Sequence, residues 1–320
     1  MKLEDIIYDK SVLDDYKNRS ANIKNELNSY KNSFSEDKWE NKYLNYLINN
    51  FDKILTCKFS DLKIHKTEFL KIIDLKNENC DCEDSNCQKC NDNKLKSNFS
   101  KILQKKLNYS NSNFREIISK KGLKTCYICN AQYAMLVTEE IKQVQNSIRQ
   151  ERDIAKFQID HYFSKSIYPA FSISLSNLYP ICGYCNSIKH NNEYDLSDVN
   201  SNLKYNLDVE SLQKYLSGHN ETLELILNDD SEGEKKISEV FDLKGIYNNH
   251  IDEIEELIER KIKYQNTYKN ILVKRFPNIN LSNKNIDDRL MLGTYSKDEG
   301  FYKRPLSKFI HDINDQLDQL

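Results

Sequence analysis

The chain has 320 residues, enough for two or three small domains that each bury a core. Its formal net charge is −2, so the chain as a whole lacks the excess positive charge of a basic nucleic-acid-binding protein, and any such surface must be local. The N-terminus has no apolar stretch typical of a secretory signal, and no apolar run approaches the roughly 20 residues of a membrane helix. We therefore expect a cytoplasmic protein with no membrane partner and with reduced thiols.

Residues 1–75 are predicted to be helical. Apolar residues recur at helical spacing from Leu13 to Tyr30 and again from Trp39 to Phe51, and residues 57–75 continue the pattern. An amphipathic face of this kind indicates ordinary helix packing, and the other interpretation is a surface for DNA or a partner.

Residues 76–98 are polar and lack apolar periodicity, but they hold four cysteines in the pattern C-x-C-x4-C-x2-C. A loop of this composition has nothing to fold around unless it binds a metal ion. A second compact zinc site is one interpretation, and a loop with incidental thiols is the other. The four residues are Cys80, Cys82, Cys87 and Cys90.

Residues 99–125 form the most basic stretch of the chain and lead into the next cysteine pair. Two short helices separated by an Asn/Ser turn are expected here. The basic side chains are typical either of a solvated helix face or of a surface that contacts DNA phosphates. They are Lys101, Lys105, Lys106, Arg115, Lys120, Lys121 and Lys124.

Two Cys-x-x-Cys pairs bracket residues 126–185: Cys126 with Cys129, and Cys182 with Cys185. Each pair points two thiolates at one place, and two pairs together form the closed tetrahedral geometry of structural zinc. Free buried cysteines or a disulfide fit less well, because two independent pairs share the same spacing. We expect one structural zinc ion that joins two distant chain segments.

Asp160 and His161 are adjacent at the end of an apolar strand, so their side chains point to opposite faces. One can hold a metal ion while the other acts on a proton. Asn186 directly follows the last cysteine and offers an oxygen ligand, and Asp plus Asn with water is a set that suits Mg²⁺ or Mn²⁺. A neutral histidine beside such an ion is suited to general-base chemistry near pH 7. The alternative is a surface Asp-His pair.

The order Cys-x-x-Cys, Asp-His, Asn, Cys-x-x-Cys-Asn-x-x-Lys resembles the HNH (ββα-metal) nucleases, and most closely their zinc-ribboned branch. The spacing from Asn177 to Asn186 is similar to that of the corresponding asparagines in the HNH domain of CRISPR effector nucleases. The resemblance covers about a third of the chain. It implies a ββα-metal core in which the strand at residues 157–163 is the second strand.

The resemblance also implies a role for each motif residue. His161 would be the general base, and Asp160 with Asn186 would hold one Mg²⁺ or Mn²⁺ ion. Asn177 would orient His161, and Lys189 would neutralise charge on the phosphate. By its residues alone, Asn177 is also typical of a helix cap, since Ser-Asn precedes an apolar stretch. The four bracketing cysteines would hold the structural zinc without taking part in the chemistry.

We expect an α+β fold: a mostly helical chain around a small ββα-metal core with a four-cysteine structural zinc. The predicted regions are a helical region with a Cys-rich loop at 1–98, a nuclease core with a basic lead-in at 99–200, and a mainly helical region at 201–320. The last region also contains two stretches typical of strands, at 203–209 and 221–229, and a terminal amphipathic helix.

The sequence thus predicts a metal-dependent endonuclease that hydrolyses DNA. The arrangement of a zinc-ribboned core between helical arms is similar to nuclease subunits of bacterial anti-phage systems of the Septu type, which implies a role in defence and an ATPase partner. Two alternatives remain open: a non-catalytic zinc-ribbon module that binds nucleic acid or protein, and an HNH nuclease that cleaves RNA.

Overall fold

The structure is a computed structural model of the chain. It describes residues 8–80, 87–108, 117, 120, 122–142, 149–155, 158–190, 192, 194, 203–218, 222–229, 231–263, 270, 271, 274–276, 291–295 and 300–319. The fold is α+β, as expected, with helices predominating and three two-stranded antiparallel sheets among these residues. No helix in the described part of the chain is long and apolar enough to cross a membrane.

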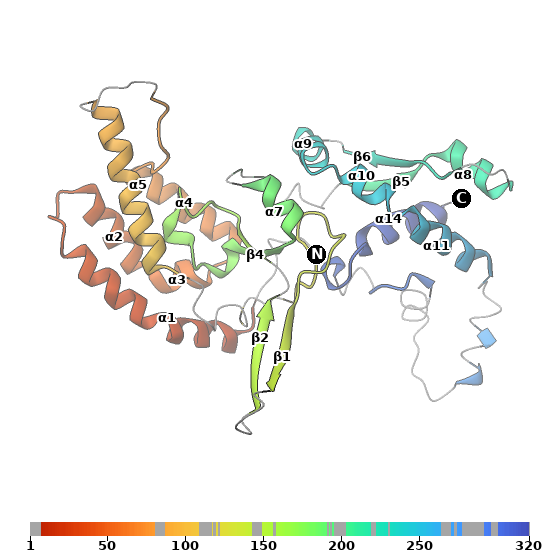
Figure 1. Ribbon diagram of the computed structural model, residues 1–320, viewed down its shortest axis with the longest axis horizontal. Helices are drawn as coiled ribbons and strands as arrows, with labels where there is room; N and C mark the ends of the chain where they lie inside the picture. The colour runs from red at the N-terminus through yellow and green to blue at the C-terminus, as the bar shows by residue number, and fades with distance from the viewer. Residues whose placement is uncertain are drawn as a thin grey trace.

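Five helices form one end of the elongated molecule (Figure 1). They pack through α1 against α2, α3 and α5, and through α2 against α4. Their bounds are Lys10–Lys31 (α1), Trp39–Asn49 (α2), Phe51–Thr56 (α3), Phe59–Ile72 (α4) and Gln88–Lys106 (α5). The helical periodicity of residues 1–75 is therefore confirmed where the structure describes it.

An aromatic cluster explains why these helices pack together. The Phe99 ring on α5 lies 4.9 Å from the Trp39 ring and 5.4 Å from the Tyr43 ring, both in edge-to-face contact. Such pairs add to the free energy gained by burying the rings. The same bundle contacts the loop at residues 162–177, where Phe163 stacks on Phe59 and Phe171 meets Phe69, each at 5.7 Å. The helical bundle therefore supports the middle of the chain.

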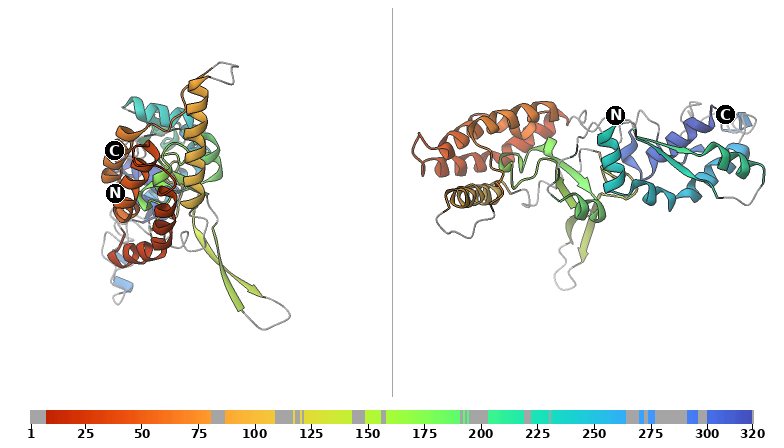
Figure 2. Two further views of the ribbon diagram at one scale, coloured as in Figure 1. Left: turned by 90° about the vertical axis from the view of Figure 1, so that its left-hand side faces the viewer. Right: turned by 90° about the horizontal axis from the view of Figure 1, so that it is seen from above.

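The middle of the chain contains two hairpins and one short helix. β1 (Leu136–Lys142) pairs with β2 (Arg149–Ala155), and this hairpin projects from the body of the molecule (Figure 2). β3 (Gln158–His161) pairs with β4 (Leu178–Ile181), and α7 (Gly183–Lys189) follows at once and packs on β3. Two short 3-10 turns, η2 (Pro169–Phe171) and η3 (Leu175–Asn177), lie in the loop between β3 and β4.

The pairing corrects one expectation. The strand at 157–163 was expected to be the second strand of the ββα core, but β3 pairs with the later strand β4 and is the first of the two strands that precede α7, whereas β1 pairs with β2. The residues of β1 and β2 are close in sequence, so their hairpin closes a short loop at low entropic cost. The result is still a strand, a strand and a helix in succession, formed by β3, β4 and α7.

The remaining elements form the other end of the molecule (Figure 1). β5 pairs with β6, which confirms both strand stretches, and α14 packs on β5 and α11. Their bounds are Lys204–Leu207 (β5), Val209–Leu216 (α8), Leu225–Asn228 (β6), Glu232–Val240 (α9), Leu243–Asn248 (α10), Ile251–Lys263 (α11), Phe301–Lys303 (η6) and Ser307–Leu317 (α14). Side-chain caps begin α8 and α9: Asp208 accepts from Ser211 N, and Ser231 forms a capping box with Glu234.

One further expectation differs from the structure, and another is untested. Residues 88–98 were expected to be part of an irregular loop but belong to α5, so the predicted boundary at 98/99 falls inside a helix. The turn expected around residues 109–116 lies outside the described residues.

We predict that Phe99→Ala destabilises the helical bundle by about 3–5 kcal/mol, because it removes the ring at the centre of the aromatic cluster and leaves a cavity. Leu95→Ala on the same helix is the matched control, since Leu95 is 56% exposed, and it should change stability by less than about 0.5 kcal/mol. Denaturant unfolding followed by circular dichroism measures both. Equal effects of the two substitutions would contradict this packing.

Candidate functional site

Four cysteine thiols meet in the middle of the molecule. The sulfur atoms of Cys126, Cys129, Cys182 and Cys185 all lie within 4.8 Å of one another, and all four residues are buried. The Sγ atoms of Cys129 and Cys182 are 3.9 Å apart. A tetrahedral zinc ion with Zn–S bonds of about 2.3 Å places its sulfur ligands about 3.8 Å apart. The cluster therefore has the spacing to hold a metal ion such as zinc, as the two Cys-x-x-Cys pairs predicted.

The local backbone explains how each pair turns its thiols inward. After the first pair, Asn130 adopts a left-handed conformation with φ of 51°, which asparagine tolerates better than most residues, and its N–H donates to the Cys126 carbonyl at 3.0 Å. In the second pair, Cys182 precedes α7, and its Sγ accepts from the Cys185 N–H at 3.5 Å. One pair is thus shaped by a tight turn and the other by a helix start.

The thiols influence one another's protonation. Burial raises the pKa of Cys126, whereas hydrogen bonds from the other three thiols lower the pKa of Cys182. Four buried thiols this close cannot all ionise without a compensating charge. A divalent cation supplies that charge and displaces the protons.

The C-terminal elements hold the first cysteine pair in place. The Tyr247 hydroxyl donates to the Cys129 carbonyl at 2.5 Å, and the Leu306 N–H donates to the Asn130 carbonyl at 2.8 Å. The Asn130 amide donates to the Phe301 carbonyl at 3.0 Å. The cluster therefore joins chain segments from the middle and the end of the sequence.

Asp160 lies beside this cluster on β3 and is 5% exposed. Its Oδ2 accepts from the Tyr127 hydroxyl at 2.5 Å, and Tyr127 is the residue between the first two cysteines. The Lys189 ammonium, from the end of α7, lies 3.1 Å from both Asp160 oxygens and donates to the His161 carbonyl at 3.2 Å. The Lys189 side chain is 1% exposed. Lys189 was expected to neutralise charge on a substrate phosphate, whereas in the structure its ammonium neutralises the buried Asp160 carboxylate.

Asn186 lies on the face of α7 that meets β3. Its Nδ2 donates to Gln158 Oε1 at 2.5 Å, and Gln158 is two residues before Asp160 on the same strand face. Asn186 and Lys189 are three residues apart and therefore share one helix face. Facing elements thus carry the two oxygen donors, Asp160 and Asn186, that the sequence predicted as ligands of a divalent ion.

His161 points away from Asp160, into the loop between β3 and β4, and is 8% exposed. Its Nε2 lies 2.9 Å from the Ser172 carbonyl oxygen. Because a carbonyl only accepts, Nε2 carries the proton and Nδ1 is the basic nitrogen of the neutral ring. Burial lowers the pKa of His161 to about 4, Lys165 and Lys189 act in the same direction, and the bond to Ser172 opposes them. The imidazole is therefore neutral near pH 7.

Asn177 is fully buried, and its amide binds main-chain groups. Its Oδ1 accepts from the Phe163 N–H at 2.7 Å, and its Nδ2 donates to the carbonyls of Phe163 at 3.1 Å and Phe171 at 3.0 Å. These bonds use both amide hydrogens and one lone pair of Oδ1, and none of them goes to the His161 ring, so Asn177 acts on the loop. The loop in turn places the Ser172 carbonyl that does bind His161.

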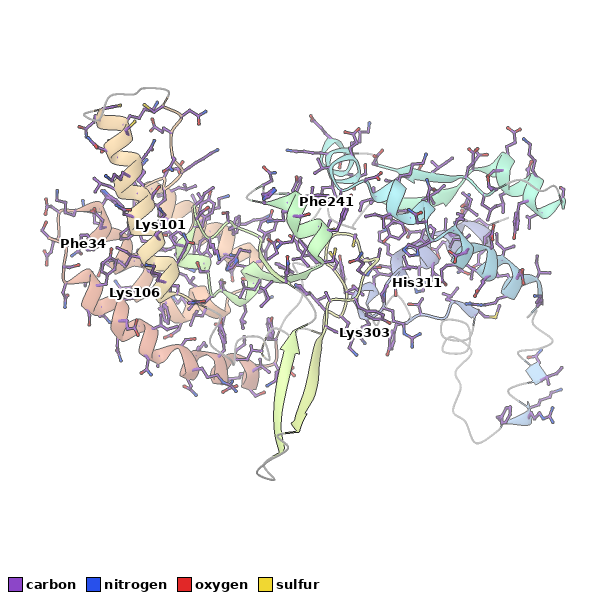
Figure 3. All side chains as sticks on the ribbon, viewed as in Figure 1. Phe34, Lys101, Lys106, Phe241, Lys303 and His311 are labelled. Carbon is purple, nitrogen blue, oxygen red and sulfur yellow. The ribbon has the colours of Figure 1, made fainter. Side chains whose placement is uncertain are left out.

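The expected basic surface is spread over more than one element. Lys101 and Lys105 are exposed on α5, and the Lys106 ammonium lies 5.5 Å from the centre of the Tyr30 ring. Figure 3 places Lys101 and Lys106 on the helical end of the molecule, whereas α7 lies nearer its middle. Lys120 and Lys124 are also exposed. Arg115 and Lys121 lie outside the described residues.

The second cysteine group also gathers in space. The sulfur atoms of Cys80, Cys87 and Cys90 lie within 4.8 Å of one another, and all three residues are half-buried. This group too could hold a metal ion such as zinc. Cys82 lies outside the described residues.

No protein-family model, curated protein or solved structure matches this chain. Its function must therefore be inferred from the residues themselves.

Two contacts of the candidate site were not predicted from the sequence: the one from Tyr127 to Asp160 and the one from Ser172 to His161. The contact of Tyr127 could have been predicted, because its position between two metal-binding cysteines directs it toward the second pair. The contact of Ser172 could not, because it is made by a main-chain carbonyl, which any residue type has.

We predict that Cys185→Ser removes one zinc ion per chain and unfolds the β3–β4–α7 unit, because structural zinc contributes about 10–16 kcal/mol of binding free energy in small sites. Cys57→Ser is the matched control: Cys57 stands outside both thiol groups and is half-buried. Elemental analysis and circular dichroism report the two quantities. Full zinc content in Cys185→Ser would argue against the site.

We predict that Lys189→Met lowers the free energy of unfolding by about 3–5 kcal/mol, because it leaves the Asp160 carboxylate buried and unpaired. The double variant Asp160→Asn/Lys189→Met removes that charge and should recover most of the loss. Denaturant unfolding of the two variants measures the difference. If the double variant is less stable than Lys189→Met alone, the ion pair does not have this role.

Proposed function

We propose that the protein is a metal-dependent endonuclease of the HNH (ββα-metal) type that hydrolyses DNA phosphodiester bonds. The observation that carries the proposal is the order β3, β4, α7 beside a four-thiol cluster, with Asp160 and His161 at the end of β3 and Asn186 on α7. These residues supply a base and two oxygen ligands within one small unit, which is what hydrolysis of a phosphodiester requires.

In this mechanism His161 is the general base. Its Nε2–H is held by the Ser172 carbonyl, so Nδ1 is the atom that removes a proton from the attacking water. The low pKa keeps the ring in its basic form at neutral pH. The fixed ring also needs no reorientation before it reacts, which lowers the entropic cost of the step.

The donor set of Asp160 and Asn186 fits Mg²⁺ or Mn²⁺ by its chemistry, since both residues offer hard oxygen atoms. When bound there, the ion would stabilise negative charge on the scissile phosphate and on the leaving oxygen. The Asp160 carboxylate already has a cationic partner in Lys189. The ammonium therefore competes with a divalent ion for Asp160, and once released it would be free to neutralise a substrate phosphate.

A role in anti-phage defence and an ATPase partner belong to the same proposal and rest on the Septu-like arrangement alone. The alternative substrate, RNA, is tested by the plasmid cleavage assay described below, with RNA in place of DNA.

One observation favours a second candidate, a non-catalytic zinc-ribbon module that binds nucleic acid or protein. The buried Asp160–Lys189 pair gives Asp160 a structural use that needs no metal ion. This candidate predicts binding without metal-dependent cleavage.

We predict that the protein nicks or linearises plasmid DNA in Mg²⁺ or Mn²⁺ and that His161→Ala lowers the rate by about 10²–10⁴-fold, the usual contribution of a general base. His250→Ala is the matched control, a histidine directly before α11 and outside the proposed site. Zinc content and circular dichroism establish that both variants are folded. Intact plasmid with the unmodified protein, or equal rates with and without His161, would refute the proposal, and cleavage of RNA but not DNA would reassign its substrate.

A further inference from the structure

The second thiol group lies at the start of α5, far along the chain from the four-thiol cluster. The Sγ atoms of Cys80 and Cys87 are 3.6 Å apart, and those of Cys80 and Cys90 are 3.4 Å apart. These separations are close to the roughly 3.8 Å between sulfur ligands of tetrahedral zinc. Cys80 comes from the chain before α5, whereas Cys87 is the N-cap residue of the helix and Cys90 lies in its first turn.

The first half of α5 lacks a side-chain cap and buries no side chain. Cys87 is the N-cap residue and makes no side-chain capping hydrogen bond, and the first turn has no acidic residue. The buried residues of α5 are Phe99, Ser100 and Leu103, all in the second half of the helix. Residues 91–94 and 96–98 are Asn, Asp, Ser and Lys, mostly weak helix formers. A helix start of this kind needs another source of stability.

The segment before the helix runs alongside it and holds Cys80 in place. Asn93 binds the Glu78 main chain twice: Oδ1 accepts from the Glu78 N–H at 3.0 Å, and Nδ2 donates to its carbonyl at 2.8 Å. One turn further, Asn77 Nδ2 donates to Ser97 Oγ at 3.2 Å. These contacts are exposed, so they set the path of residues 77–80 along the helix but contribute little to the free energy of folding.

We propose that Cys80, Cys87 and Cys90 bind a second zinc ion that stabilises the start of α5. Binding exchanges three thiol protons for one Zn²⁺, so the three thiolates and the ion carry a net charge of −1. Negative charge at the N-terminal end of a helix is favourable, because the free N–H groups of the first turn point toward it. The ion thereby supplies the capping that the helix otherwise lacks.

This second site differs from the four-thiol cluster in its accessibility. Its three cysteines are half-buried, whereas Cys126, Cys129, Cys182 and Cys185 are at most 5% exposed. A chelator or an oxidant reaches an accessible thiolate first. The second zinc should therefore leave before the first, and its loss should loosen residues 88–97 while the four-thiol cluster remains intact.

The test is zinc stoichiometry and release from the full chain. Elemental analysis should give two zinc ions per chain, and release to EDTA, followed with a chromogenic zinc indicator, should show a fast and a slow phase of one ion each. Cys90→Ser should remove the fast phase alone, whereas Cys57→Ser should keep both phases. Hydrogen exchange should rise in residues 88–97 of Cys90→Ser and stay unchanged in α7.

One zinc ion per chain in the unmodified protein would overturn the proposal, and so would two ions retained by Cys90→Ser. If Cys90→Ser does not fold, native mass spectrometry of the unmodified protein during EDTA treatment decides the matter. A folded species with one zinc supports the proposal, and simultaneous loss of both ions contradicts it. None of these outcomes depends on nuclease activity.

Discussion

The four-thiol cluster of Cys126, Cys129, Cys182 and Cys185 is the constraint on which the rest of the structure depends. It joins two segments more than fifty residues apart, and the second segment starts α7. A structural zinc ion in such a cluster binds with about 10–16 kcal/mol, as much as the whole free energy of unfolding of a typical domain, about 5–15 kcal/mol. β3, β4 and α7 are each at most seven residues long. Elements this short need an added cross-link to stay ordered.

The cluster also determines where the polar side chains of the candidate site lie. Tyr127, between two of the cysteines, reaches Asp160, and α7, whose N-cap residue is Cys182, carries Asn186 and Lys189 to β3. His161 depends on a different support, the loop that the helical bundle holds through Phe163 and Phe171. The His161 imidazole and the Asp160 carboxylate are neighbours in sequence but are positioned by separate parts of the molecule. Loss of either support should therefore misplace one of them relative to the other.

The sequence predicted local features of the site well. The paired spacing of the cysteines predicted the thiol cluster, and the apolar stretch around Ile159 predicted the strand that carries Asp160 and His161. It did not predict that β3 pairs with β4, because periodicity identifies a strand but not its partner. Nor did it predict the burial of Lys189, a residue type that is almost always exposed unless it is paired. Its burial follows from the place of α7 against β3, which is a property of the whole fold.

The central claim is that a zinc-held strand, strand and helix position two oxygen donors to bind a hydrolytic cation and one imidazole to act as the base. Anomalous diffraction from crystals grown with Mn²⁺ tests it most directly. The account predicts a zinc peak among the four thiols and a manganese peak between Asp160 and Asn186, with the Lys189 ammonium moved away from the carboxylate. A zinc peak alone, with Lys189 still bound to Asp160 at saturating Mn²⁺, would contradict it.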